Sequence, residues 1–73
     1  MDLKTLKENY NKVLEREKNA EKFLDAATQE QFKKWFPEFN KIIKELSGMM
    51  KEFEKITGRK MTRYEVLNGF WMD

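Results

Sequence analysis

The sequence predicts an all-α fold in which an antiparallel hairpin of two long helices is followed by a short third helix. Apolar residues recur at alternating intervals of three and four over two long stretches, which places them along one side of a helix. The capping-box sequence Thr28-Gln29-Glu30-Gln31 separates the two stretches, and a second one, Thr62-Arg63-Tyr64-Glu65, opens the last segment. A connection this short favours an antiparallel arrangement of the helices that it joins.

The first helix is expected over residues 3–26, with Asp2 as its N-cap. Its apolar repeat contains one charged member, Glu17. A charge in a seam either specifies a partner or reaches the rim of the helix, where we expect Glu17 to pair with Lys41 or another lysine of the second helix. We prefer the rim position. The repeat comprises Leu3, Leu6, Tyr10, Val13, Glu17, Ala20, Leu24 and Ala27.

The second helix is expected over residues 29–57, with Gly58 ending it in the left-handed conformation. Pro37 lacks a backbone N–H and its ring clashes with the carbonyl four residues earlier, so the helix should be kinked or broken near this residue. If it is broken, a short helix over residues 29–35 precedes one with Pro37 in its first turn. The apolar repeat comprises Phe32, Trp35, Phe39, Ile42, Leu46, Met49, Phe53 and Ile56.

Folding the chain at Thr28 sets which residues of the two helices face each other. Residues whose numbers sum to about 56 should lie at the same height along the hairpin. This pairing matches Leu24 with Phe32 and Tyr10 with Leu46. Small residues of the first helix then face the aromatic half of the second, which fills an interhelical layer well.

The third helix is expected over residues 63–68, with Gly69 as its stop. A helix this short is unstable alone in water. We therefore expect Val66 or Leu67, together with Phe70 and Trp71, to fold back over the open end of the hairpin. A two-helix hairpin gains the third element that it needs in this way.

The composition excludes several classes of function. The chain has 73 residues, enough for one domain, and contains neither cysteine nor histidine. It therefore lacks the usual ligands of zinc, haem and iron–sulfur sites, a proton shuttle near neutral pH and a thiol nucleophile. Its three glycines stand singly, so no phosphate-binding loop is present. We expect a protein that is not an enzyme and needs no cofactor or metal.

The charge pattern is that of a solvated helix surface. Fifteen lysines and arginines and 13 acidic residues leave a net charge of +2, with both signs spread along the chain. The charged N-terminus has no apolar signal-peptide core, and no stretch reaches the ~20 apolar residues of a membrane span. We expect a soluble, cytoplasmic protein with no role at a membrane.

Apolar residues exceed what one seam and a short cap can bury. The chain holds six phenylalanines, two tryptophans, two tyrosines and five methionines. Aromatic residues and methionine are enriched in protein interfaces, so the surplus predicts a protein-binding or dimerisation face. A homodimer built as a four-helix, coiled-coil-like bundle is the simplest form. The candidate interface residues are Trp35, Phe36, Phe39, Ile43, Met50, Phe70 and Trp71, of which the last two could instead belong to the core.

An alternative function uses the only local basic cluster, which consists of Arg59, Lys60 and Arg63 with the adjacent Tyr64. The cluster lies at a turn before a helix start, where backbone N–H groups attract phosphate. Tyr64 or Trp71 could stack on a base. This alternative is a small nucleic-acid-binding protein.

The C-terminal run Thr57-Gly58-Arg59-Lys60-Met61-Thr62-Arg63-Tyr64-Glu65-Val66-Leu67-Asn68-Gly69-Phe70 resembles the ends of small, lysine- and glutamate-rich helical proteins encoded by phages and prophages of low-GC bacteria. The resemblance covers about a fifth of the chain, and its motif is mostly capping chemistry. It implies an accessory or regulatory protein that acts by binding a host or phage partner. It assigns no functional residues.

Overall fold

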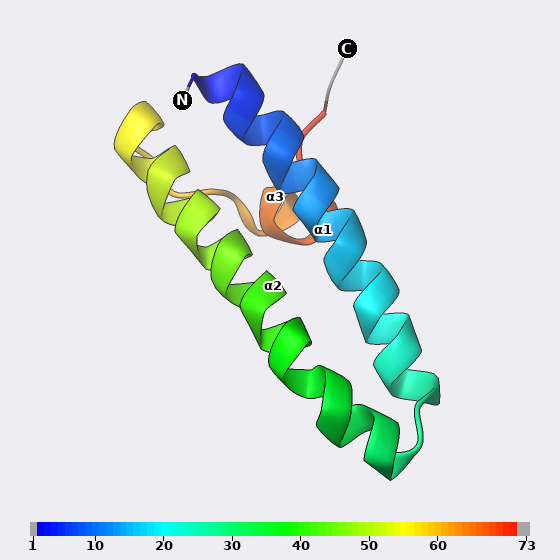
Figure 1. The fold of residues 1–73 in the computed structure, drawn as a ribbon. Helices are drawn as coiled ribbons and strands as arrows, with labels where there is room; N and C mark the ends of the chain where they lie inside the picture. The colour runs from blue at the N-terminus through cyan, green and yellow to red at the C-terminus, as the bar shows by residue number, and fades with distance from the viewer. Residues whose placement is uncertain (1, 72–73) are drawn as a thin grey trace.

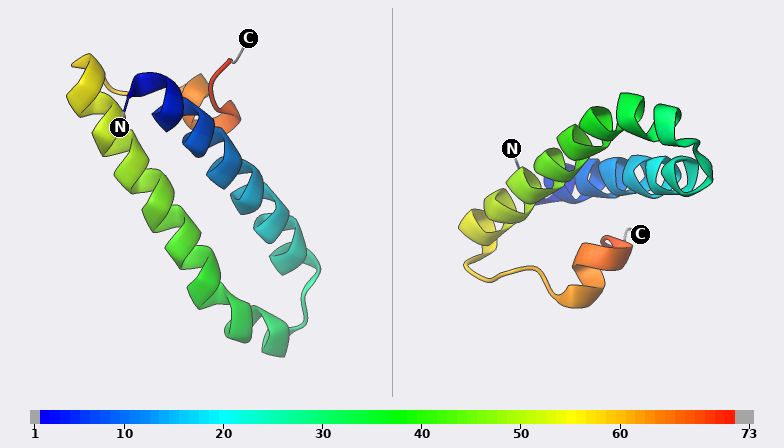
Figure 2. Two further views of the ribbon diagram at one scale, coloured as in Figure 1. Left: turned by 45° about the horizontal axis from the view of Figure 1, so that its top comes forward. Right: turned by 90° about the horizontal axis from the view of Figure 1, so that it is seen from below.

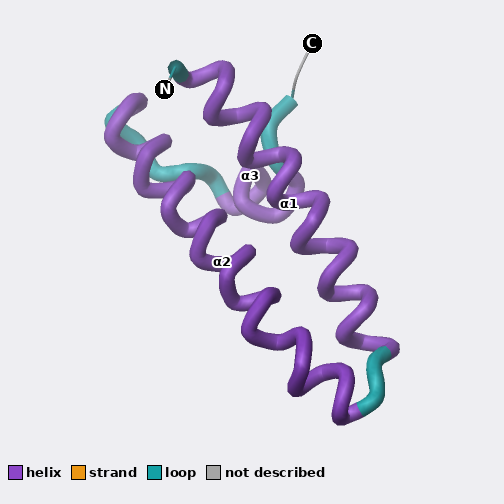
Figure 3. The backbone as a smooth tube through the Cα atoms, in the orientation of Figure 1, coloured by secondary structure: helices purple, strands orange, loops and turns teal. Residues whose placement is uncertain are grey.

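The computed structural model describes residues 2–71, and nearly all of them lie in three helices (Figures 1 and 3). Helix α1 spans Leu3–Ala26, α2 spans Gln29–Thr57 and α3 spans Arg63–Asn68. These bounds are the ones expected from the sequence. Helices α1 and α2 form one antiparallel layer, and α3 lies on one face of it, in the half remote from the loop (Figure 2). The predicted all-α hairpin with a third helix is therefore confirmed.

Side-chain caps fix where the helices begin. The Asp2 carboxylate accepts a hydrogen bond of 2.7 Å from the Thr5 N–H. At the start of α2, the Thr28 hydroxyl accepts from the Gln31 N–H at 3.2 Å and the Thr28 N–H donates to the Gln31 side chain at 3.1 Å. Each cap satisfies backbone donors that the first turn of a helix leaves unpaired, which is why the boundaries could be read from the sequence.

Pro37 does not break α2, which continues as one helix from Gln29 to Thr57. The right-hand view of Figure 2 shows the helix bending in the half that contains this residue. A bend is the expected response, because it moves the carbonyl of Lys33 away from the proline ring. Of the two alternatives drawn from the sequence, the break into two helices does not occur.

The buried core lies entirely in the half of the hairpin that α3 covers, and no residue between positions 15 and 45 is buried. Partly buried residues pack around it: Ile42, Met49, Met50, Met61 and Phe70. We call the part of the hairpin between positions 15 and 45, which includes the loop and contains no buried residue, the loop half. The buried apolar side chains are Leu6, Tyr10, Val13, Leu14, Leu46 and Phe53.

Near the loop, the side chains of α1 and α2 meet about two residues beyond the expected pairing. The expected pairing puts Phe23 level with Lys33, whereas the Phe23 ring packs on Trp35 at 6.3 Å between centroids. Side chains on a helix lean toward its N-terminus, by about one residue. In an antiparallel pair the two leans run in opposite directions along the hairpin, so contacting residues have higher numbers than backbone heights suggest.

Helix α3 is held by contacts between distant parts of the chain. The Tyr10 hydroxyl donates to the Val66 carbonyl at 2.9 Å. The Asn11 side chain makes two hydrogen bonds with Phe70: its amide donates to the Phe70 carbonyl at 2.9 Å, and its oxygen accepts from the Phe70 N–H at 2.7 Å. The Phe70 ring lies 5.5 Å from Tyr10 and 5.2 Å from Phe53. The segment thus lies across one face of the hairpin instead of over its open end.

Candidate protein-interaction surface

Large apolar side chains remain exposed in the loop half. We define the loop-half surface as Phe23, Phe32, Trp35, Phe36 and Ile43, whose side chains are 39–47% exposed. They are partly ordered by one another: the rings of Phe32 and Phe36 stack at 5.0 Å, and Phe23 meets Trp35 edge to face. Such contacts between neighbours keep the rings in place, although water still reaches them.

The loop-half surface has two sides. Consecutive residues point about 100° apart around a helix, so Trp35 and Phe36 diverge. Trp35 and Phe23 border a crevice of about 120 Å³, lined also by Ala20, Leu24, Glu38, Phe39 and Ile42. Phe32, Phe36 and Ile43 recur at intervals of four and seven, which places them together on the side of α2 that faces α3.

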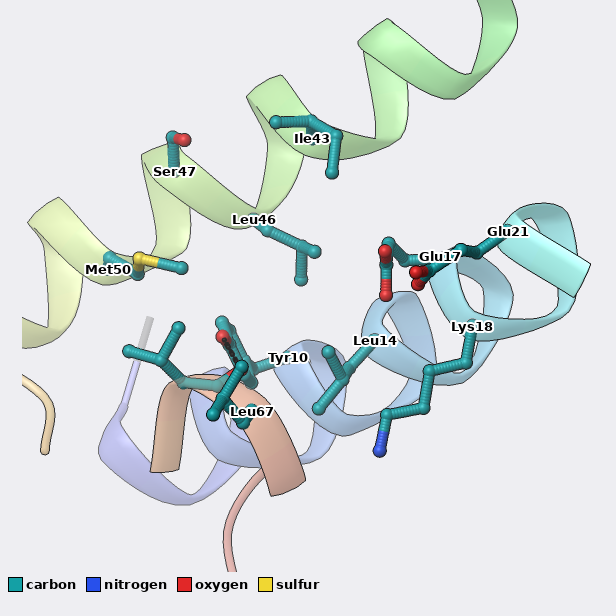
Figure 4. Close-up of a pocket in the computed structure, with 11 residues that line it drawn as sticks. Tyr10, Leu14, Glu17, Lys18, Glu21, Ile43, Leu46, Ser47, Met50 and Leu67 are labelled. Atoms are coloured by element: carbon teal, nitrogen blue, oxygen red, sulfur yellow. Dashed lines mark hydrogen bonds between the residues drawn. The ribbon is translucent and has the colours of Figure 1, made fainter. Parts of the chain in front are cut away.

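On the side of α3, a groove of about 270 Å³ runs between the three helices (Figure 4). Ile43, Leu46 and Met50 form its α2 wall, and Tyr10 and Leu14 form its α1 wall. Helix α3 closes one side with Val66 and Leu67. The volume is slightly below the ~300–1,000 Å³ of pockets that enclose small ligands, so the groove is suited to side chains of a partner.

Two carboxylates stand at the end of this groove nearest the loop. Glu17 and Glu21 lie side by side on α1 (Figure 4). The pKa of Glu17 is raised because burial removes water from the carboxylate, and a hydrogen bond and charge repulsion from Glu21 raise it further. Lys18 also lines the groove, but its side chain extends away from both carboxylates in Figure 4. This end of the groove therefore favours a cation.

The expected pairing of Glu17 with Lys41 does not occur. Lys41 lies 3.2 Å from Glu38, one turn earlier on its own helix. The ion pair between the two long helices joins Arg16 to Glu45 at 3.7 Å, with both side chains largely exposed. Glu17 instead lines the groove, together with the apolar side chains of Ile43 and Leu46.

The remaining predicted interface residues are divided between surface and core. Phe39 and Met50 are partly buried, with Phe39 in the crevice and Met50 in the groove. Phe70 packs on Tyr10 and Phe53, so it belongs to the core and not to an interface. Trp71 is 89% exposed and does not cover the hairpin, contrary to the expected fold-back.

Arg59, the first residue of the predicted basic cluster, is engaged within the chain. Its guanidinium donates to both carboxylate oxygens of Glu65, at 2.9 and 3.2 Å, and to the Lys60 carbonyl at 3.1 Å. It also lies 4.8 Å from the centre of the Phe53 ring. Lys60, Arg63 and Tyr64 are exposed. Arg59 thus secures the loop before α3, which leaves fewer cations for a phosphate.

The Glu65 carboxylate is the most strongly perturbed acid of the described residues. Its pKa falls from an ordinary 4.5 to about 2, chiefly because Arg59 donates to it and also because it accepts from the Thr62 N–H. Thr62 in turn caps α3 by accepting from the Glu65 N–H at 3.1 Å. Glu65 therefore both completes the predicted capping box and holds the loop before α3 through Arg59.

Acid is expected to weaken the attachment of α3. A carboxylate whose pKa is lower in the folded protein than in the unfolded chain stabilises the fold at any pH above its unfolded pKa of 4.5. This stabilisation is lost as the pH falls through its folded pKa of about 2. We expect the wild type to melt at a higher temperature than Glu65→Gln near neutral pH, and the difference to shrink between about pH 5 and pH 2. Glutamine can keep the capping hydrogen bonds with Thr62, so the comparison removes the charge and one of the two Arg59 hydrogen bonds while leaving the cap in place. A difference that is the same at every pH would contradict this assignment.

Phe23, Phe32 and Glu21 belong to the candidate surface or its groove without having been identified from the sequence as functional, and so does Asn11 to the attachment of the C-terminal segment. Asn11 is a lone polar residue beside the apolar stripe, and only the position of Phe70 gives it a role. Glu21 stands one turn after Glu17, a spacing that does signal a carboxylate pair on one face.

Residues 2–71 contain no cluster of three or more acidic, histidine or cysteine side chains placed to hold a metal ion. No helix within them has an apolar stretch long enough to cross a bilayer. Comparison of the chain with protein-family models, with curated proteins and with solved structures finds no match.

Proposed function

We propose that this protein is a non-enzymatic interaction module that binds another polypeptide through its loop-half surface. One observation carries the proposal: all the buried apolar side chains lie in the half of the hairpin remote from the loop, whereas five large apolar side chains of the loop half stay 39–47% exposed. A stable monomer gains nothing from leaving such groups in water, since full burial of such a side chain is worth about 1.5–3 kcal/mol and burial of the remaining two-fifths about 0.6–1.2 kcal/mol.

The composition of the surface supports the proposal. At these exposures the five side chains present on the order of 400 Å² of apolar area, divided between the two sides of the hairpin, since an aromatic side chain buries about 150–250 Å² in full. Aromatic anchors with charged residues around them are also the usual composition of binding hot spots.

The resemblance of residues 57–70 to small phage-type proteins fits the same proposal, because it implies an accessory protein that binds a host or phage partner. Nucleic-acid binding gains no comparable support, since Arg59 is bound to Glu65. Self-association through the loop-half surface is one form that binding could take, with a dimer as the simplest product.

Affinity capture from a bacterial lysate tests the proposal. We expect the tagged wild type to retain a defined protein, or further copies of itself, through nuclease treatment and a salt gradient. Phe36→Ala and Trp35→Ala should each weaken retention at least about tenfold, as is typical of aromatic anchors worth over 1.4 kcal/mol. Helicity should be unchanged because both side chains are exposed.

Tyr64→Ala is the matched control. It removes an aromatic side chain that is 71% exposed and lies on α3, outside the loop-half surface. Retention should therefore match that of the wild type. The proposal would be contradicted if Tyr64→Ala reduced retention as much as the loop-half variants do, or if nuclease released the captured material. Either result would favour a nucleic-acid site at Lys60, Arg63 and Tyr64.

A further inference from the structure

We infer that the occupant of the loop-half surface is a cationic amphipathic helix, which lies beside α3 along the groove between α1 and α2. The inference rests on the proposed function and names its partner class. It concerns the side of the surface formed by Phe32, Phe36 and Ile43, which continues the groove toward the loop.

Helix α3 shows what kind of element the groove accepts. It occupies the part of the groove remote from the loop and presents Val66 and Leu67 to it. It forms a second layer over the hairpin, and Figure 2 shows that this layer ends midway, with nothing of the described chain lying over the loop half. A helix that enters beside α3 would extend the same layer, as in a helix-in-groove complex.

The α2 wall provides the apolar contacts for such a helix. Ile43, Phe36 and Phe32 follow one another along α2 beyond Leu46, each 39–40% exposed. The stretch from position 43 to position 32 is roughly 16 Å long at 1.5 Å per residue. A partner helix of about 11–14 residues, with apolar residues at intervals of three and four, covers this length.

The α1 wall supplies the charge. Glu17 and Glu21 stand together at the groove, and Asp25 follows Glu21 by one more turn of the same face. Lys18 is the single basic residue lining the groove, and it extends away from the two glutamates. The groove is therefore acidic in a protein whose net charge is +2. A helix with lysine or arginine along one flank matches both walls.

A second copy of the chain fits this side less well. Helix α3 stands on the same face, so two hairpins cannot stack face to face along their length (Figure 2). A twofold axis across the hairpin lets only the loop halves overlap, and it sets the α1 carboxylates of one copy against those of the other. A single helix avoids both conflicts.

Two designed peptides test the inference by charge exchange. Both are capped helices of about 14 residues with leucines at intervals of three and four. One carries lysines along a single flank and the other carries glutamates in the same positions. Binding of each labelled peptide is measured by fluorescence anisotropy with the wild type, with the double variant Glu17→Lys/Glu21→Lys, and with Phe36→Ala.

The wild type should bind the lysine peptide at least about tenfold more tightly than the glutamate peptide, and the double variant should reverse this preference. Phe36→Ala should weaken binding of the lysine peptide at least about tenfold. Equal affinity of the wild type for the two peptides, or affinity for neither, would overturn the inference. So would sedimentation of the wild type alone as a dimer that Phe36→Ala dissociates, because a second copy would then occupy the surface.

These outcomes separate the inference from the proposed function. If lysate capture depends on Phe36 but peptide binding is indifferent to charge, the loop-half surface binds a polypeptide of another kind and only the inference fails. If capture is the same for wild type and Phe36→Ala, the proposed function fails, and the peptide result has no bearing on it.

Discussion

Replacing Phe53 by alanine is expected to lower the free energy of unfolding by about 3–5 kcal/mol, the range for a fully buried phenylalanine. Its side chain is 1% exposed, packs 5.2 Å from Phe70 and lies under the Arg59 guanidinium. A core of this size supplies only about 3–5 kcal/mol in total, so the variant should be largely unfolded at room temperature. Urea unfolding followed by circular dichroism measures the effect.

Phe36→Ala is the matched control for this prediction, since it makes the same substitution on the same helix at a residue 39% exposed. It should cost about 1 kcal/mol or less, because surface substitutions rarely cost more. Comparable destabilisation by the two variants would show that Phe36 is a core residue, and the assignment of the loop-half surface would have to be withdrawn.

Gly69→Ala is expected to destabilise the fold by on the order of 3 kcal/mol. Gly69 has φ 81° and ψ −166°, a conformation almost restricted to glycine and costing other residues about 1–3 kcal/mol. An added Cβ would also collide with the side-chain oxygen of Asn11. That oxygen accepts from the Phe70 N–H, so the collision removes the bond that holds the C-terminal segment on α1.

The other two glycines provide graded controls for Gly69→Ala in the same unfolding experiment. Gly58 is also left-handed, but a Cβ there meets nothing within 4 Å, so Gly58→Ala should cost only about 1–2 kcal/mol. Gly48 is inside α2 with open space around it, and Gly48→Ala should stabilise the protein by about 1 kcal/mol. A cost at Gly69 no larger than that at Gly58 would mean that the Asn11 contact contributes nothing.

The helices could be predicted from the sequence because local chemistry determines them. The caps at Asp2, Thr28 and Thr62 each satisfy donors within three residues, so their effect does not depend on the rest of the fold. Gly58 ends α2 for the same kind of reason. The sequence does not distinguish a kink at Pro37 from a break, because both relieve the same local clash and packing decides between them.

The candidate site was predicted less completely because it depends on register and on the placement of α3. Glu17 lines a largely apolar groove while Lys41 pairs with Glu38 on its own helix, and neither arrangement follows from a local pattern. The position of α3 on one face, which no local pattern encodes, placed Phe70 in the core and left Trp71 exposed. Trp35 and Phe36 are exposed in the loop half, as the surplus of ten aromatic residues over the capacity of one seam predicts, whereas the exposure of Phe23 and Phe32 was not predicted.

The hydrogen bonds between Asn11 and Phe70 also impose an order of events on folding. They join positions 59 residues apart, whereas the turn at residues 27 and 28 joins neighbouring helices. Local contacts form sooner than distant ones because they close smaller loops. During synthesis, Tyr10 and Asn11 are made early. Their hydrogen bonds to Val66 and Phe70, which enclose the core, form only after the C-terminal segment has been made. The nascent hairpin is therefore uncovered along its whole length until the C-terminal segment docks, and from then on the loop half is the part of the hairpin that α3 leaves uncovered.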